Sequence, residues 1–166
     1  MSSDAIVVLK QDHKQMRELF RQFARAKDVE QRARVIEQVV EALTAHTYIE
    51  NECMYPRVRE LLPDTTDDIL ESYEEHHVAD VLSAELAAMK PEDKRYYAKA
   101  TVLIENLTHH MEEEEQDWFR TVRNGLSRKQ LKELGQQLLE LKESARRQPM
   151  QPHTLTGRKR LGQRIA

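Results

Sequence analysis

A short motif that occurs twice constrains this chain more than any other feature of its sequence. Residues 43–56 read Leu-Thr-Ala-His-Thr-Tyr-Ile-Glu-Asn-Glu-Cys-Met-Tyr-Pro, and residues 107–119 read Leu-Thr-His-His-Met-Glu-Glu-Glu-Glu-Gln-Asp-Trp-Phe. Each copy has Leu-Thr-x-His, a Glu four residues after the His and an aromatic residue nine after it. Residues four apart lie on one face of a helix. The motif therefore predicts two helices that each direct a His and a Glu to the same side.

The two pairs are His46 with Glu50 and His110 with Glu114. A single pair of this kind is usually a surface contact. Two copies at matching offsets favour a metal site, which helical bundles build from inward His and carboxylate side chains. Glu50 also continues an apolar stripe through Leu43. An unpartnered carboxylate in a core costs several kcal/mol, so we expect a neutralising group beside Glu50.

Composition indicates one helical domain. The 166 residues include only four Gly and five Pro, and 33% are charged, which suits helices around a single core. The net charge of -3 gives no indication of nucleic-acid binding by the body of the chain. No apolar run reaches membrane-spanning length, the first twenty residues lack signal-peptide features, and one Cys excludes an internal disulfide. We expect a soluble, cytoplasmic protein without membrane contact.

Apolar residues at steps of three and four predict five helices. Ser2 or Ser3 is expected to cap the first, and Asp28 to open the second, in which Pro56 marks a kink or a restart. The others are expected at about residues 68–89, 92–124 and 127–147.

These helices predict an all-α fold, an antiparallel up-down-up-down four-helix bundle with an appended C-terminal helix. We expect residues 1–147 to form this one domain, with the fifth helix at residues 127–147. Residues 148–166 contain Pro, Gly and scattered basic residues, and they are expected to form a flexible basic tail.

The first and third helices each offer one more inward histidine. His13 lies on the apolar stripe of the first helix, where a lone His is more often a core residue than a ligand. On the third helix, His76 and His77 lie on equally passable stripes. The repeat favours His76, because an acidic residue precedes both His13 and His76, which lie 63 residues apart. Tyr73 faces inward in either register, as a core aromatic or as a neighbour of a metal.

The register of the fourth helix decides between two His and Glu pairs. Pairing His109 with Glu113 would bury the polar residues 105–106, so we favour His110 with Glu114 and expect Glu113 to face water.

Four inward histidines and two glutamates are enough for two divalent ions bridged by the carboxylates, although six ligands could also surround one ion. Imidazole with carboxylate suits iron, and also manganese or zinc. Positions left open for water or dioxygen distinguish a working site from a structural one. Cys53 is expected to be a core residue rather than a ligand.

At these residues the chain resembles the hemerythrin-like family, also called the HHE cation-binding domain, over roughly residues 4–122. The resemblance rests on four elements in the family's order: Asp12-His13, His46-x3-Glu50 with Tyr55-Pro56, Glu75-His76-His77 and His110-x3-Glu114. It implies a four-helix bundle around a non-haem di-iron centre, oxo- or hydroxo-bridged, that meets dioxygen or its relatives. The metal ligands that it implies are His13, His46, Glu50, His76, His110 and Glu114.

The sequence departs from the oxygen-carrying hemerythrins, which look like they use five histidines and an H-x3-H pair on the third helix. Ser72 and Asp80 stand four residues before and after His76, and His77 has no histidine at these offsets either. This departure argues against reversible oxygen carriage. It also leaves a metal coordination position that Tyr73 or solvent could fill.

Three classes of function remain, in order of preference. The first is a protein that binds or senses oxygen, related small molecules or iron. The second is a di-iron redox enzyme acting on peroxide, nitric oxide or dioxygen, and the third is a helical interaction module without functional metal. No substrate pocket or further general base can be read from the chain. A protein partner could use the C-terminal helix or tail, and nucleic-acid binding by the tail is not favoured.

Overall fold

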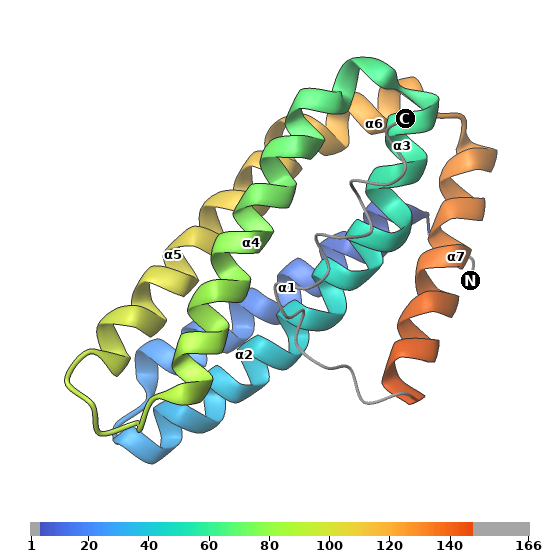
Figure 1. The fold of residues 1–166 in the computed structure, drawn as a ribbon. Helices are drawn as coiled ribbons and strands as arrows, with labels where there is room; N and C mark the ends of the chain where they lie inside the picture. The colour runs from blue at the N-terminus through green and yellow to red at the C-terminus, as the bar shows by residue number, and fades with distance from the viewer. Residues whose placement is uncertain (1–3, 148–166) are drawn as a thin grey trace.

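The computed structural model describes residues 4–147, and in them every regular element is helical. Four antiparallel rods form an up-down-up-down bundle, which confirms the predicted fold class (Figure 1). The rods are α1 (Ala5–Arg25), α2 (Val29–Ile49) continued by η1 (Glu50–Met54) and α3 (Tyr55–Leu61), α4 (Thr66–Ala88), and α5 (Tyr96–Glu113) continued by η3 (Glu114–Trp118) and α6 (Phe119–Gly125). A 3-10 turn, η2 (Pro63–Thr65), precedes α4, and α7 (Arg128–Arg147) is the appended helix. The predicted tail, residues 148–166, lies outside the described residues.

Aspartate side chains cap the first two helices. Asp4 caps α1 by accepting a hydrogen bond from the Val7 N–H, so the expected Ser2 or Ser3 cap was wrong. Asp28 caps α2 as predicted, accepting from the backbone N–H of residue 31 at 2.7 Å.

The fourth rod begins later than its sequence suggested. We expected it near residue 92, but α5 starts at Tyr96. The Asp93 carboxylate accepts a hydrogen bond from the Arg95 N–H at 2.8 Å, which holds the chain in a turn that the periodicity did not show.

The apolar core is divided into two clusters along the bundle axis. One includes Leu9, Ile49 and Trp118, and the other includes Met16 and Leu107. On each rod, the inner stripe changes from apolar to polar between these clusters. The division leaves one polar layer across the middle of the bundle.

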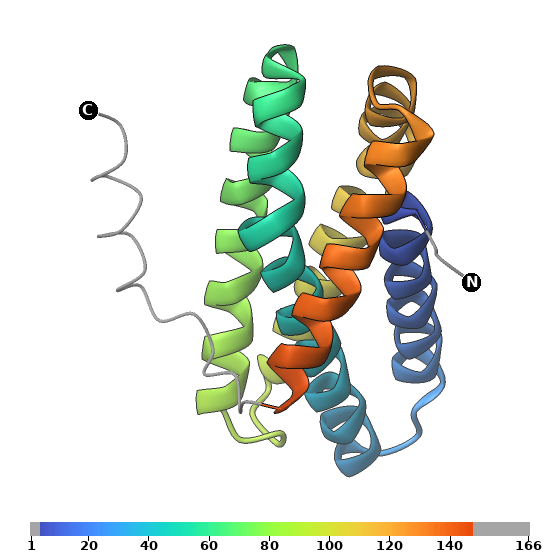
Figure 2. The same ribbon diagram turned by 90° about the vertical axis from the view of Figure 1, so that its right-hand side faces the viewer.

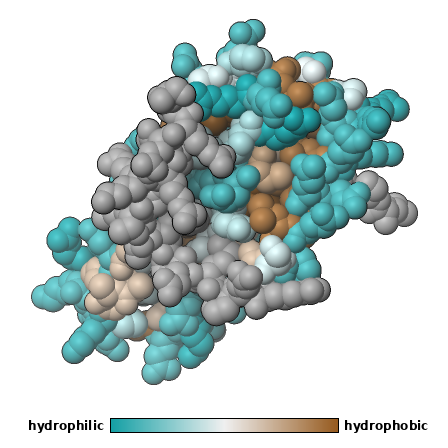
Figure 3. Space-filling model, turned by 45° about the vertical axis from the view of Figure 1, so that its right-hand side comes forward, coloured by the Kyte–Doolittle hydropathy of each residue, from teal (hydrophilic) through white to brown (hydrophobic). Residues whose placement is uncertain are grey.

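Helix α7 covers only one side of the bundle. It packs on α1, α2 and η1, as Figure 2 shows, and its Leu131, Leu134 and Leu138 are buried there. Where Figure 3 shows the described residues, the surface is mostly hydrophilic, with apolar patches right of centre, at the upper edge and, more weakly, at the lower left. Within residues 4–147, no helix has the length and apolar character needed to cross a bilayer.

Candidate metal centre

One histidine from each of the four rods enters the polar layer. All four are at most 3% exposed: His13, His46, His76 and His110. The rings form two pairs, with Nε2 atoms 3.2 Å apart between His13 and His46 and 3.0 Å apart between His76 and His110. The two pairs supply the nitrogen donors of the site.

Two buried carboxylates span these pairs. An oxygen of Glu50 lies 3.2 Å from His46 Nε2 and 3.3 Å from His76 Nε2. An oxygen of Glu114 lies 3.3 Å from His13 Nε2 and 3.7 Å from His110 Nε2. Each glutamate therefore contacts its own helix and one helix of the other pair. The structure brings together all six residues predicted as ligands.

The register predictions agree with this geometry. His76 enters the site, whereas His77 is only partly buried. On α5, His110 is buried, and the His109 and Glu113 side chains are 64% and 52% exposed. The internal repeat therefore identified the inward histidine of the third helix.

A second layer of residues fixes the orientation of each ring. Every Nδ1 atom faces an oxygen acceptor from another rod: Glu115 for His13 at 2.8 Å, Asp12 for His46 at 3.4 Å, Asn51 for His76 at 2.9 Å and Glu75 for His110 at 2.5 Å. An Nδ1 that donates its proton outward leaves the Nε2 lone pair of the neutral ring directed inward. When all four rings are neutral, as metal binding requires, four such lone pairs converge on the polar layer.

The sequence reasoning missed the hydroxyl that reaches the centre. Tyr55 is fully buried, and its OH donates a hydrogen bond to Glu114 at 2.9 Å and lies 3.4 Å from Glu50. Tyr73, expected to face inward as a core aromatic or as a neighbour of a metal, is partly buried against the core and donates to the Asn51 carbonyl at 3.4 Å. The motif did contain a signal for this hydroxyl, an aromatic residue nine positions after the His. In a regular α-helix, however, that residue would face away from the site.

A π-helical turn after each Glu explains the difference. The Tyr55 N–H bonds to the Glu50 carbonyl, and the Phe119 N–H bonds to the Glu114 carbonyl, five residues back in each case. In an α-helix, residues five apart diverge by roughly 140°, whereas a π turn returns them to one face. The same turn moves Cys53, expected on the inner stripe, to a half-buried position outside the six ligand candidates.

Burial and mutual charge separate the pKa values of the two glutamates. Burial, with the nearby Glu114 charge, raises the pKa of Glu50 to about 7. Burial also acts to raise the pKa of Glu114, but His110 and His13 outweigh it and lower this pKa to about 2. Without metal, Glu50 is thus the carboxylate that retains a proton, and Glu114 the one that stays ionised.

The histidines differ in the same way. Burial acts to lower the pKa of His110, but Glu114 and Glu75 raise it to about 9. Burial, together with the His110 charge, lowers the pKa of His76 well below its usual value. The metal-free centre therefore holds an imidazolium and a neutral imidazole side by side.

The donor set fits divalent cations. Glu50 Oε1 and Glu114 Oε2 are buried and accept no hydrogen bond within the described structure. Two groups of donor atoms lie close enough to hold an ion: His13, His46, Glu50 and Glu114 in one, and Glu50, His76 and His110 in the other. Bound cations would supply partners for both oxygens and for the converging lone pairs.

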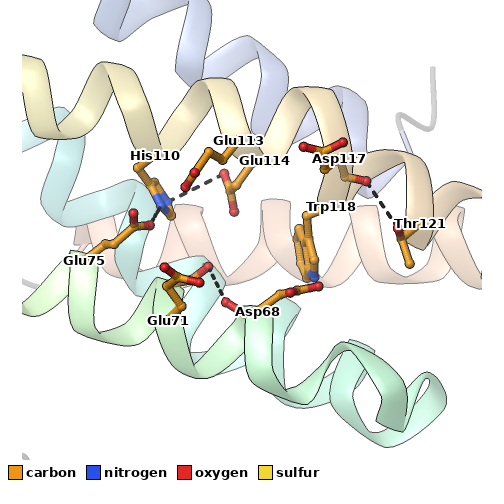
Figure 4. A pocket seen from close by; sticks show the side chains of 10 residues that line it. Asp68, Glu71, Glu75, His110, Glu113, Glu114, Asp117, Trp118 and Thr121 are labelled. Carbon is orange, nitrogen blue, oxygen red and sulfur yellow. Dashed lines mark hydrogen bonds and ion pairs between the residues drawn. The ribbon is translucent and has the colours of Figure 1, made fainter.

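A polar pocket of about 190 Å³ leads from the surface to this centre. It lies between α4 and the α5–η3 rod, with His110 and Glu114 among its lining residues. In Figure 4, Asp68 and Glu71 project from α4 on the side opposite Glu114. The pocket gives water, ions or small molecules a route to the buried donors.

Comparisons with known proteins agree with this centre. A DNA nickase of Nostoc sp. is 28% identical over 123 residues, which are 74% of this chain and 34% of that protein, so the chain spans about a third of its length. The crystal structure of a hemerythrin HHE cation binding domain-containing protein from Mycobacterium kansasii shares the fold, with a TM-score of 0.75, 23% identity, and 87% of this chain and 88% of that chain covered. The hemerythrin HHE cation binding domain matches residues 4–122, and the chain belongs to this family.

Proposed function

We propose that the chain binds two divalent ions, most naturally iron, in the polar layer and uses them to bind or sense dioxygen, a related small molecule or iron itself. One observation carries the proposal, namely two buried histidine pairs spanned by two carboxylates. The proposed ligands are His13, His46, Glu50, His76, His110 and Glu114. The same donors suit zinc or manganese, so metal identity needs direct measurement.

The protein residues have distinct roles in this proposal. The two carboxylates would hold the ions and neutralise their charge, and the Nδ1 acceptors keep the rings in place. The Tyr55 hydroxyl holds a proton 2.9 Å from Glu114, one of the proposed ligands. A bound iron pair would supply open coordination positions and redox capacity.

A di-iron redox enzyme acting on peroxide, nitric oxide or dioxygen is the second candidate. The Tyr55 hydroxyl and the pocket to the surface favour it, because turnover needs a proton donor and a path for exchange. DNA nicking is not part of the proposal, since this chain covers only a third of the nickase. We further propose that the protein is cytoplasmic. Contact with a protein partner through α7 or residues 148–166 remains a prediction.

Elemental analysis of protein produced with iron available tests the metal proposal. Close to two ions per chain is expected, and much less than one ion in every metal tried would contradict it. Optical spectra of the reduced iron form then separate the two functions. A stable oxygenated species supports binding, whereas rapid bleaching with peroxide consumption supports the enzyme.

A further inference from the structure

The pocket beside α4 is lined by an unusual concentration of negative charge. Six carboxylates line it: Asp68, Glu71, Glu75, Glu113, Glu114 and Asp117. Among the described residues, no Lys or Arg belongs to this lining. A cleft lined by one sign of charge raises the local concentration of the opposite ion and its association rate.

Two approaches to the centre, along the bundle axis and on the side of α1 and α2, are closed by apolar or covered surface. Along the bundle axis, the two hydrophobic clusters lie on either side of the polar layer, and a cation crossing them would lose its hydration. On the side of α1 and α2, α7 covers the site. The pocket, by contrast, gives a polar approach to the centre, with His110 and Glu114 in its lining.

A buried oxygen without a hydrogen bond lies at the inner end of this pocket. Glu114 is 3% exposed, lines the pocket, and its Oε2 accepts no hydrogen bond. This same atom lies 3.7 Å from His110 Nε2 and 3.3 Å from His13 Nε2. An ion that reaches Glu114 is therefore already between the two histidine pairs.

A second group of ligand atoms lies beside the pocket, and two of its three residues, Glu75 and Glu113, line it. Glu75, His109 and Glu113 each offer one donor atom within 4.8 Å of the others, and none of these residues is fully buried. His109 Nε2 is 3.2 Å from Glu113, and Glu75 also holds His110 Nδ1 at 2.5 Å. Because a carboxylate has two oxygens, Glu75 can contact an outer cation and still orient the inner ligand.

We infer that this pocket is the route by which divalent cations load the centre, and that Glu75, His109 and Glu113 form an outer holding site on that route. The inference rests on the proposed metal function and adds to it a separate cation site. The outer site binds weakly because water competes for its exposed groups. Its role is to capture the hydrated ion and pass it to His110 and Glu114.

Stopped-flow loading of metal-free protein with Co²⁺ tests this route, because cobalt absorbs visible light when imidazole and carboxylate replace its water ligands. The E71Q/E113Q protein is expected to load roughly five-fold or more slowly than the parent. Its final stoichiometry should be unchanged, since neither residue is among the six inner ligands. The parent rate should fall steeply with added salt, and the variant rate much less. His109→Gln should slow loading by a smaller factor.

The matched control is E105Q/E112Q, which removes the same charge from exposed positions on α5 that do not line the pocket. It should load like the parent. Equal loading rates in the parent, E71Q/E113Q and E105Q/E112Q, with full loading of the parent, would overturn the proposed route but not the metal function. A reduced final stoichiometry in E71Q/E113Q would also overturn it, because these residues would then act on the centre itself. No cobalt uptake by the parent would overturn the metal function and the route together.

Discussion

The two halves of the bundle are built on one plan. The first half comprises α1 and the α2–η1–α3 rod, and the second comprises α4 and the α5–η3–α6 rod. In each, the aromatic residue after the π turn stacks on a histidine of the other half at a ring distance of 5.6 Å, Tyr55 on His76 and Phe119 on His13. Each half thereby completes the site of the other.

The two halves differ in individual side chains near the site and in what covers their outer surfaces. Tyr55 carries a hydroxyl and Phe119 does not, and the acceptor that follows the glutamate is the neutral Asn51 in one half and the charged Glu115 in the other. Helix α7 covers the first half, whereas the acidic pocket opens beside the second. The repeat therefore sets the positions of the six candidate ligands. Features that the two halves do not share, α7 and the pocket, distinguish the closed side of the bundle from the open one.

The largest expected effect compares the two glutamates. Metal that binds only the folded state should stabilise the parent by roughly 3 kcal/mol or more, and either Glu50→Gln or Glu114→Gln should remove most of this gain. Without metal, Glu50→Gln should be no less stable than the parent at pH 7, because it removes a buried acid with a raised pKa. Glu114→Gln should lose about 1–3 kcal/mol, because it removes one of the two ionised carboxylates that stabilise the His110 imidazolium and leaves only Glu75. Thermal melting with chelator and with added metal measures both effects.

Glu113→Gln is the control for this comparison, since Glu113 is exposed and one residue away from Glu114. It should melt like the parent without metal, and also at metal concentrations that fill only the inner centre, because the proposed outer site that includes Glu113 binds weakly. Equal metal-free stabilities of the Glu50 and Glu114 variants would show that the two carboxylates share the proton evenly.

The pH dependence of the metal-free protein sharpens the same contrast. The folded pKa of Glu50 is raised from 4.5 to about 7, so its contribution to stability is fully present below pH 4.5 and is lost as the pH rises to 7. The raised pKa of His110, about 9, continues this loss from pH 6.5 upward. Glu50→Gln should flatten the curve between pH 5 and 7. Denaturant titration with chelator across this range is the measurement, and an unchanged slope in the variant would contradict the assignment.

Tyr55→Phe makes the aromatic positions of the two halves alike. It removes the hydrogen bond to Glu114 and leaves a buried carboxylate oxygen without a donor, at a cost of about 1–2 kcal/mol. Tyr73→Phe is the matched control, because its hydroxyl makes only a 3.4 Å contact with a carbonyl. Urea unfolding should rank Tyr55→Phe well below Tyr73→Phe, and the reverse order would place the important hydroxyl on Tyr73.

The smallest expected effect concerns α7, which covers the first half of the bundle. It tests whether this helix influences stability and metal binding at the site. The Lys142 ammonium of α7 pairs with Asp12, whose carboxylate holds His46 Nδ1. Lys142→Met should lower stability by about 0.5–1 kcal/mol, since the pair is partly buried, and should weaken metal binding several-fold. Lys132→Met, at an exposed position on α7, should change neither. Metal titration of the two variants decides, and equal affinities would separate α7 from the centre.

The sequence predicted the fold and the six candidate ligands because both depend on local spacing. Apolar steps of three and four define the rods, and the H-x3-E interval defines which face each ligand shares. The match between Asp12-His13 and Glu75-His76, 63 residues apart, resolved His76 from His77, which periodicity alone could not separate. Whether those six residues hold metal remains a prediction.

The hydroxyl, the second layer and the route to the surface depended on tertiary structure. A π turn, which no spacing rule anticipated, rotates Tyr55 into the site. The Nδ1 partners, such as Asn51 for His76, come from other rods, so they depend on how the helices are rotated and staggered against each other. Sequence periodicity shows which face of a helix is buried, but only helix packing decides which residues of two faces meet.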